Sequence, residues 1–131
     1  MDLGHLQPPL PRNEPVLGYA HGSPERAWLR KELARVRAEP VEIPVVIGGE
    51  RLFTGATQQL RAPHDHSISL GRFHNADAAQ MQRAIDAALA ARSEWARTPV
   101  EQRAAVFLKA AELLSCRYRQ RMNAVTMLSL S

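Results

Sequence analysis

The stretch "VEIPVVIGGERLFTG" (residues 41–55) decides the fold, because it predicts a tight β-hairpin. A β-branched run leads to Gly48 and Gly49, which suit a two-residue turn with positive φ. A return strand then runs toward Phe53. Pro44 lies inside the first run, which indicates an edge strand or a strand start.

A second pair of extended segments follows the hairpin. We predict a strand from Gln58 to Ala62, a turn at "PHDH" (residues 63–66), and a return strand through Ile68 and Leu70. Ile68 and Leu70 alternate with polar residues, as in a strand with one buried face.

A helix is predicted before the hairpin, after a proline-rich, aperiodic N-terminal arm. Ser23 suits the N-cap, and Pro24 suits the first helical position, where a missing N–H costs nothing. Pro40 ends the pattern. The predicted buried stripe consists of Leu29, Leu33 and Val36.

Two more helices are predicted from Asp77 onward. Asp77 and Gln80 match a capping box at the start of the first. Thr98, Pro99 and Glu101 predict the start of the second, with Thr98 as its N-cap. Met81, Ile85 and Leu89 recur on one face of the first helix, and the expected core face of the second consists of Ala104, Phe107, Leu108, Ala111 and Leu114.

The composition of the 131 residues favours a folded chain with a thin core. Hydrophobic residues make up 45% of the chain, but aromatic residues only 5%, and alanine buries little area. We therefore expect a missing partner. Without it, apolar side chains such as Ile85, Leu89, Phe107 and Leu128 should be more exposed than in a complete domain.

The net charge of +4 comes mainly from arginine and permits nucleic-acid binding. The arginines are spread along the chain between glutamates and alanines, which is typical of solvated helix faces. In "RYRQR" (residues 117–121) three arginines lie two residues apart, so a helix would fan them round its circumference. The pattern favours solvated faces over a nucleic-acid site.

Two further features could carry chemistry. His64, Asp65 and His66 are ligand types for zinc, but no third cluster follows and the stretch has turn composition. Cys116 could be a nucleophile, yet no histidine is near it in sequence. We expect a structural thiol and no metal site, and we assign no catalytic, cofactor-binding or metal-binding residue.

The start of the chain has no apolar run of the kind found in signal peptides, and a single cysteine cannot form an internal disulfide. No segment approaches the roughly 20 apolar residues that span a bilayer. These features predict a cytoplasmic protein.

Five segments, in order and spacing, resemble the delta-1-pyrroline-5-carboxylate dehydrogenase (L-glutamate gamma-semialdehyde dehydrogenase) family of the aldehyde dehydrogenase superfamily. They are "NEPVL" (13–17), "GSPER" (22–26), "IP" (43–44), "AIDAALAARSEW" (84–95) and "FLKAAELLS" (107–115). The resemblance implies an α/β fold, N-terminal part only, with an extended arm at 1–20 and an incomplete aldehyde dehydrogenase domain at 21–131. The element order is then arm, helix, hairpins and three helices.

The resemblance also implies an activity for the whole enzyme, the NAD-dependent oxidation of glutamate gamma-semialdehyde to glutamate in proline breakdown. In that family a cysteine thiolate attacks the aldehyde and a glutamate activates water. The motifs for these groups lie downstream of the part that this chain resembles. The resemblance therefore implies NAD and a homo-oligomer for the parent, but no cofactor and no activity for this chain.

The last fifteen residues, "RYRQRMNAVTMLSLS", predict a third helix, with Met122, Val125 and Leu128 on one face. The agreement with the family ends at Ser129, so we expect an N-terminal fragment with a missing C-terminal remainder. A natural truncation, a change of reading frame and a deliberately shortened chain all fit this expectation. Two rival hypotheses are a small basic nucleic-acid-binding module and an assembly piece that docks on a full-length aldehyde dehydrogenase.

Overall fold

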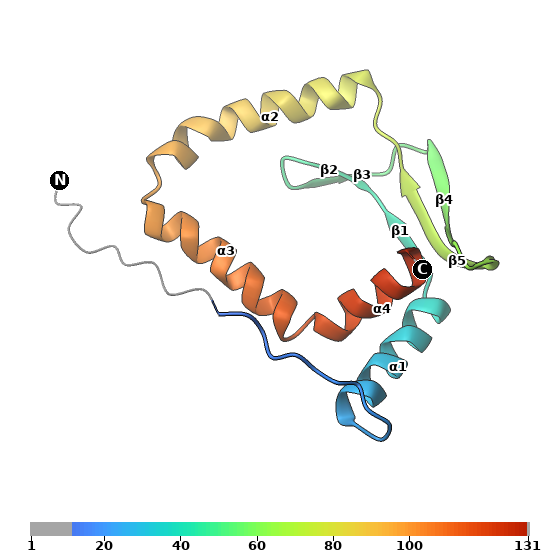
Figure 1. Cartoon of the computed structure of the whole chain (residues 1–131). Coiled ribbons are helices and arrows are strands. Elements are labelled where there is room, and N and C mark those ends of the chain that lie inside the picture. Colours follow the sequence, from blue (N-terminus) through green and yellow to red (C-terminus); the bar gives the residue numbers. More distant parts are fainter. Residues whose placement is uncertain (1–11, 131) are drawn as a thin grey trace.

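The computed structural model describes residues 12–130, and its helices and antiparallel strand pairs follow the predicted order. After the arm come helix α1 (Pro24–Ala38) and the strands β1 (Val41–Ile43), β2 (Val45–Ile47), β3 (Glu50–Leu52), β4 (Thr57–Ala62) and β5 (Asp65–His74). Three helices follow, α2 (Ala78–Arg97), α3 (Val100–Ser115) and α4 (Arg119–Leu130). Figure 1 shows α2, α3 and α4 running in an open arc that returns to α1 and the sheet.

The hairpin is confirmed as β2 and β3, which pair antiparallel. Gly48 and Gly49 have φ values of 58° and 85°, a conformation that favours glycine at both turn positions. The hairpin tip lies against α2, because a Cβ added at Gly48 would be 3.7 Å from the Cβ of Ala87. Glu50 of β3 also forms an ion pair with Arg83 of α2.

We had predicted one strand before the glycines, and this prediction was wrong. Pro44 divides the run into β1, which pairs parallel with β5, and β2, which pairs with β3 in a separate sheet. Proline lacks the N–H that a continuous ladder requires, so the chain changes sheets there. The three-stranded sheet has the order β1-β5-β4.

The second extended pair is confirmed as β4 and β5, which are antiparallel with register shifts on either side of Arg61. The turn is shorter than the predicted "PHDH", because Asp65 and His66 already belong to β5.

Local capping confirms two predicted helix starts and corrects a third. The Ser23 side chain accepts a hydrogen bond from the backbone N–H of Arg26, and Asp77 and Gln80 form a complete capping box. Thr98 is not an N-cap. Its hydroxyl donates to Glu94 O and ends α2, while Pro99 keeps an extended ψ of 142° and α3 begins after it.

The core lies where α1 and α4 meet the three-stranded sheet. Ala62, Leu70 and Leu128 form its fully buried centre, and the half-buried Leu33, Val36, Leu60 and Ile68 pack around them. Leu128 is only 2% exposed, so the prediction that it would be exposed was wrong. Helix α4 packs on α1 and β4, which the helical pattern alone could not indicate.

The apolar faces of α2 and α3 are not a core within this chain. Neither helix contains a buried residue. Ile85, Leu89 and Phe107 are 50%, 58% and 67% exposed, as we had predicted. The predicted core face of α3 is wrong for residues 12–130, because Leu108 and Leu114 are also at least half exposed.

The arm is held against α4. The Tyr19 hydroxyl donates to Oε1 of Gln120 at 3.2 Å and accepts from Nδ2 of Asn123 at 2.9 Å. Nη2 of Arg119 donates to Pro15 O at 2.9 Å. Residues 15–19 therefore lie along the start of the last helix.

Candidate functional site

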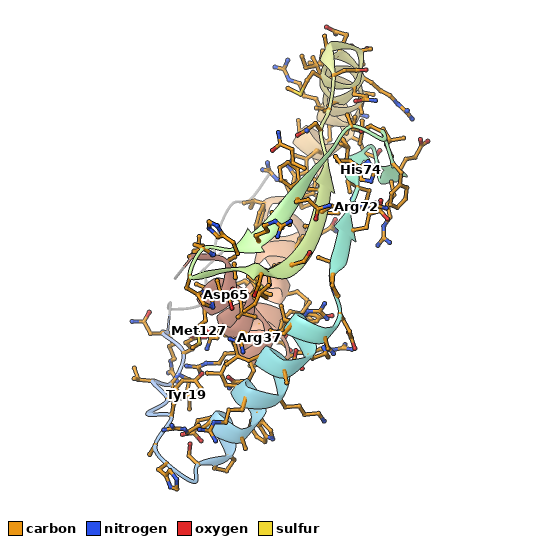
Figure 2. All side chains as sticks on the ribbon, turned by 90° about the vertical axis from the view of Figure 1, so that its right-hand side faces the viewer. Tyr19, Arg37, Asp65, Arg72, His74 and Met127 are labelled. Carbon is orange, nitrogen blue, oxygen red and sulfur yellow. The ribbon has the colours of Figure 1, made fainter. Side chains whose placement is uncertain are left out.

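Three polar side chains meet where β1 lies beside β5, and Figure 2 labels the two that come from β5, Arg72 and His74. Glu42 of β1 faces Arg72 of β5 in the parallel register. Oε1 of Glu42 accepts hydrogen bonds from Nε of Arg72 at 3.0 Å and from Nε2 of His74 at 2.8 Å. Nη2 of Arg72 lies 2.9 Å from the same oxygen. We call these residues the Glu42 cluster.

The position of His74 is fixed from both sides of its ring. The backbone N–H of Gly55 donates to Nδ1 of His74 at 3.1 Å, so the neutral ring carries its proton on Nε2 and donates it to Glu42. The His74 side chain is 4% exposed, and the Phe53 ring packs edge-on against it. The imidazole of His74 thus links the segment before β4 to β1.

The electrostatics of the Glu42 cluster favour an ionised Glu42 and a protonated Arg72. Hydrogen bonds from Arg72 and then His74 lower the pKa of Glu42, and the bond to Glu42 raises the pKa of Arg72. An ionised carboxylate and a permanent cation are poor proton carriers at neutral pH. The cluster therefore joins β1 and β5 through an ion pair and hydrogen bonds.

His64 lies in the turn between β4 and β5, and Asp65 and His66 are the first residues of β5. The carboxylate of Asp65 accepts from the backbone N–H of Ser67 at 2.9 Å and from its hydroxyl at 2.6 Å. These bonds, the hydroxyl first, lower the pKa of Asp65. Within residues 12–130 no three side chains of ligand type come together. Asp65 stabilises the turn into β5.

Cys116 lies at the exposed C-terminal end of α3. Its Sγ is 3.8 Å from the Ser115 hydroxyl, which is a weak hydrogen-bonding partner and not a general base. Within residues 12–130 the four candidate residues, His64, Asp65, His66 and Cys116, do not come together in a catalytic arrangement. The prediction that the chain carries no catalytic residue stays a prediction.

The arginines of "RYRQR" have different surroundings. Arg119 turns to the arm, where it contacts Pro15 and Glu14. Arg117 and Arg121 line one groove together with residues of α1. The spacing in the sequence predicted that Arg119 points away from Arg117 and Arg121. It did not predict that α1 forms the opposite wall of the groove that Arg117 and Arg121 line.

The sequence analysis missed both the Glu42 cluster and this groove. Arg72 and His74 are two residues apart and so share a face of β5, which was a usable signal. Their partner Glu42 depends on a parallel pairing between distant strands, for which the sequence contains no local signal.

None of the helices within residues 12–130 is long and apolar enough to cross a bilayer. The predicted cytoplasmic location itself stays a prediction.

Comparison with known proteins gives consistent results. Delta-1-pyrroline-5-carboxylate dehydrogenase of Agaricus bisporus is 44% identical over 117 residues, which are 88% of this chain and 21% of that protein. The mitochondrial enzyme of the same name from Mus musculus is 45% identical over 115 residues, or 88% and 20% of the two chains. The chain thus spans about a fifth of the length of the curated relatives it matches.

The solved structures agree with the sequence relatives. The crystal structure of the Mycobacterium tuberculosis delta-pyrroline-5-carboxylate dehydrogenase bound with NAD and cobalamin matches with a TM-score of 0.90 and 45% identity. The match covers 98% of this chain and 24% of that one. The 1-pyrroline-5-carboxylate dehydrogenase from Thermus with bound NAD matches with a TM-score of 0.81 and 32% identity, over 89% of this chain and 22% of that one.

The model of the aldehyde dehydrogenase family matches residues 53–129, which is more than half of the chain. The matched region contains β4, β5 and the three helices α2, α3 and nearly all of α4. This chain therefore belongs to the aldehyde dehydrogenase family, and its sequence and fold resemble part of the delta-1-pyrroline-5-carboxylate dehydrogenases.

Proposed function

We propose that this chain is the N-terminal part of an NAD-dependent delta-1-pyrroline-5-carboxylate dehydrogenase, which oxidises L-glutamate gamma-semialdehyde to glutamate in proline breakdown. The observation that carries the proposal is the match to the Mycobacterium tuberculosis enzyme, at 45% identity and a TM-score of 0.90 over 98% of the chain. The match covers nearly the whole chain, hairpin and helices included. It supports a specific enzyme as well as the general fold.

In the proposed reaction the aldehyde carbon is oxidised to a carboxylate, NAD takes up the hydride, and water supplies the second oxygen. The described residues have a structural part in it. The Glu42 cluster joins strands, and Cys116 lacks a neighbouring base. We propose that the rest of the enzyme supplies the nucleophile, the base and the NAD site.

The partner of this chain is, in this proposal, that remainder of the enzyme. The exposed faces of α2 and α3 support it, because Leu89 and Phe107 are 58% and 67% exposed and would be buried by a further domain. Burial of such faces contributes about 25 cal/mol per Å² of apolar area. We also propose that the protein is cytoplasmic and that the full-length enzyme forms a homo-oligomer.

A chimera tests the proposed function directly. Residues 12–130 of this chain would replace the matching region of the Mycobacterium tuberculosis enzyme, and NADH formation with glutamate gamma-semialdehyde would be measured. We expect kcat/KM within about tenfold of that enzyme, because the replaced part is structural. A folded chimera that binds NAD but does not oxidise the semialdehyde would contradict the proposal.

The matched control is a chimera that carries Phe107→Asp and Leu89→Asp. These changes place charges on the faces that should meet the remainder, so we expect an enzyme that fails to assemble. The purified 131-residue chain provides a second measurement, and turnover of the semialdehyde by this chain alone would show that the catalytic groups have been placed wrongly.

A further inference from the structure

A basic groove lies between α1 and the junction of α3 with α4. Trp28, Lys31 and Arg35 of α1 form one wall, and Arg117, Tyr118 and Arg121 form the other. The spacing on α1 is i, i+3 and i+7, which keeps the three side chains on one face of the helix. We use the name basic groove for these six residues.

The positive charge of the basic groove is largely uncompensated. Glu32 also lines the groove, as its one carboxylate, and Arg35 lies 3.5 Å from Glu32 and 4.0 Å from Glu39, so carboxylates offset the charge of Arg35. Within residues 12–130, Lys31, Arg117 and Arg121 have no carboxylate within ion-pair distance. These three cations, from both walls, thus face one volume of about 610 Å³.

Two aromatic side chains stand among these cations. Trp28 is 61% exposed and Tyr118 is 39% exposed, although both residue types usually bury most of their rings. The Arg117 guanidinium already lies 5.4 Å from the centre of the Tyr118 ring. Exposed rings of this kind offer flat apolar surfaces to a planar ligand.

We propose that the basic groove binds a small ligand that combines a phosphate group with a planar aromatic ring, of the class of nucleoside phosphates. Arg117, Arg121 and Lys31 hold the phosphate oxygens, because guanidinium groups match phosphate geometry and the lysine adds a point charge. The Trp28 or Tyr118 ring stacks on the aromatic part. The inference rests on the groove alone and is independent of the proposed function.

The size of the groove favours a small molecule over a macromolecule. Its volume of about 610 Å³ falls within the range of roughly 300–1,000 Å³ found for small-ligand sites. Away from the groove the arginines are partnered or scattered: Arg119 contacts Glu14, and Arg83 contacts Glu50. No continuous basic track for a long polyanion leads away from it among these residues.

The test uses the fluorescence of Trp28. The chain has two tryptophans, so Trp95→Phe leaves Trp28 as the single indole. ADP is the probe, with adenosine as the ring without phosphate and pyrophosphate as the phosphate without ring. We expect saturable quenching by ADP, competition by pyrophosphate, and adenosine binding weaker than ADP by about tenfold or more, the value of one charge-assisted contact.

Variants locate the site. Arg121→Ala and Lys31→Ala should each weaken ADP binding by about tenfold. Arg92→Ala, which removes an exposed cation from α2, should change it by less than about twofold. Calorimetry with Trp28→Leu provides a readout without the indole, and weaker binding is expected.

Four results would overturn the proposal. They are the absence of saturable ADP binding, adenosine binding as tight as that of ADP, an Arg92→Ala effect equal to that of Arg121→Ala, and tighter binding of a single-stranded oligonucleotide than of ADP. The last result would assign the groove to nucleic acid instead.

Discussion

Gly71 of β5 lies so close to Val41 of β1 that a Cβ at position 71 would be 1.9 Å from the carbonyl oxygen of Val41. Gly71 also has a φ of 130°, which L side chains rarely adopt. The parallel pairing of β1 with β5, and with it the Glu42 cluster, depends on this absent side chain.

Gly71→Ala should therefore destabilise the chain by at least about 2 kcal/mol, through backbone strain and a clash with backbone atoms that cannot move aside. Urea unfolding followed by circular dichroism measures the loss. Gly18→Ala is the matched control, because nothing lies within 4 Å of a Cβ at that position. Equal effects of the two variants would contradict the close approach.

Leu128→Ala should cost about 2–5 kcal/mol, because the side chain is 2% exposed and fills the centre of the core. Leu130→Ala removes the same atoms two residues later, at a position that is 79% exposed. Its unfolding midpoint in urea should match that of the original chain. A Leu128→Ala chain with unchanged stability would mean that α4 does not pack on the sheet.

Tyr19→Phe should weaken the attachment of the arm by about 1 kcal/mol, because Asn123 and Gln120 lose their shared hydroxyl partner. Limited proteolysis is the measurement, and cleavage within residues 12–20 should become faster. Tyr118→Phe removes a hydroxyl from an exposed position just before α4 and should leave the cleavage rate unchanged. Faster cleavage in both variants would argue against a specific contact.

The Glu42 cluster should make stability depend on acid pH. Hydrogen bonds from Arg72 and His74 lower the pKa of Glu42 below 4.5 in the folded chain. A group of this kind stabilises the fold fully above its unfolded pKa, and the stabilisation is lost as the pH falls through the lower folded pKa. The unfolding midpoint in urea, measured from neutral pH to about pH 3, should therefore fall less steeply in Glu42→Gln.

Glu94→Gln is the control for this pH series, because Glu94 is exposed on α2. Its pH profile should follow that of the original chain. A Glu42→Gln profile that also follows it would show that the cluster contributes no pH dependence.

Local signals in the sequence were enough to predict the helices and the two antiparallel strand pairs, but not the separate strand β1. The turn at Gly48 and Gly49 and the caps at Ser23 and Asp77 are encoded within four residues, and the structure confirms all of them. Thr98 was misassigned because two helices compete for it. Its hydroxyl bonds to the helix before it, and the pattern of the helix after it gave no sign of this.

Contacts between distant segments could not be predicted. Val41 meets Gly71, and α1 meets α4, only through the tertiary fold. Leu128 shows the consequence, since its helical pattern was identified correctly and its burial was not. The basic groove has the same origin, because its two walls are about ninety residues apart in the sequence.

The arm has a consequence for the order of folding during synthesis. The partners of Tyr19 in α4 are 101 and 104 residues further along the chain. A ribosome must therefore make α4 before the arm can dock. Helix α1 also cannot complete its packing until then, because α4 forms one of the main contacts of α1. A segment that leaves the ribosome early is thus among the last to reach its place, and until then its apolar residues are available to chaperones.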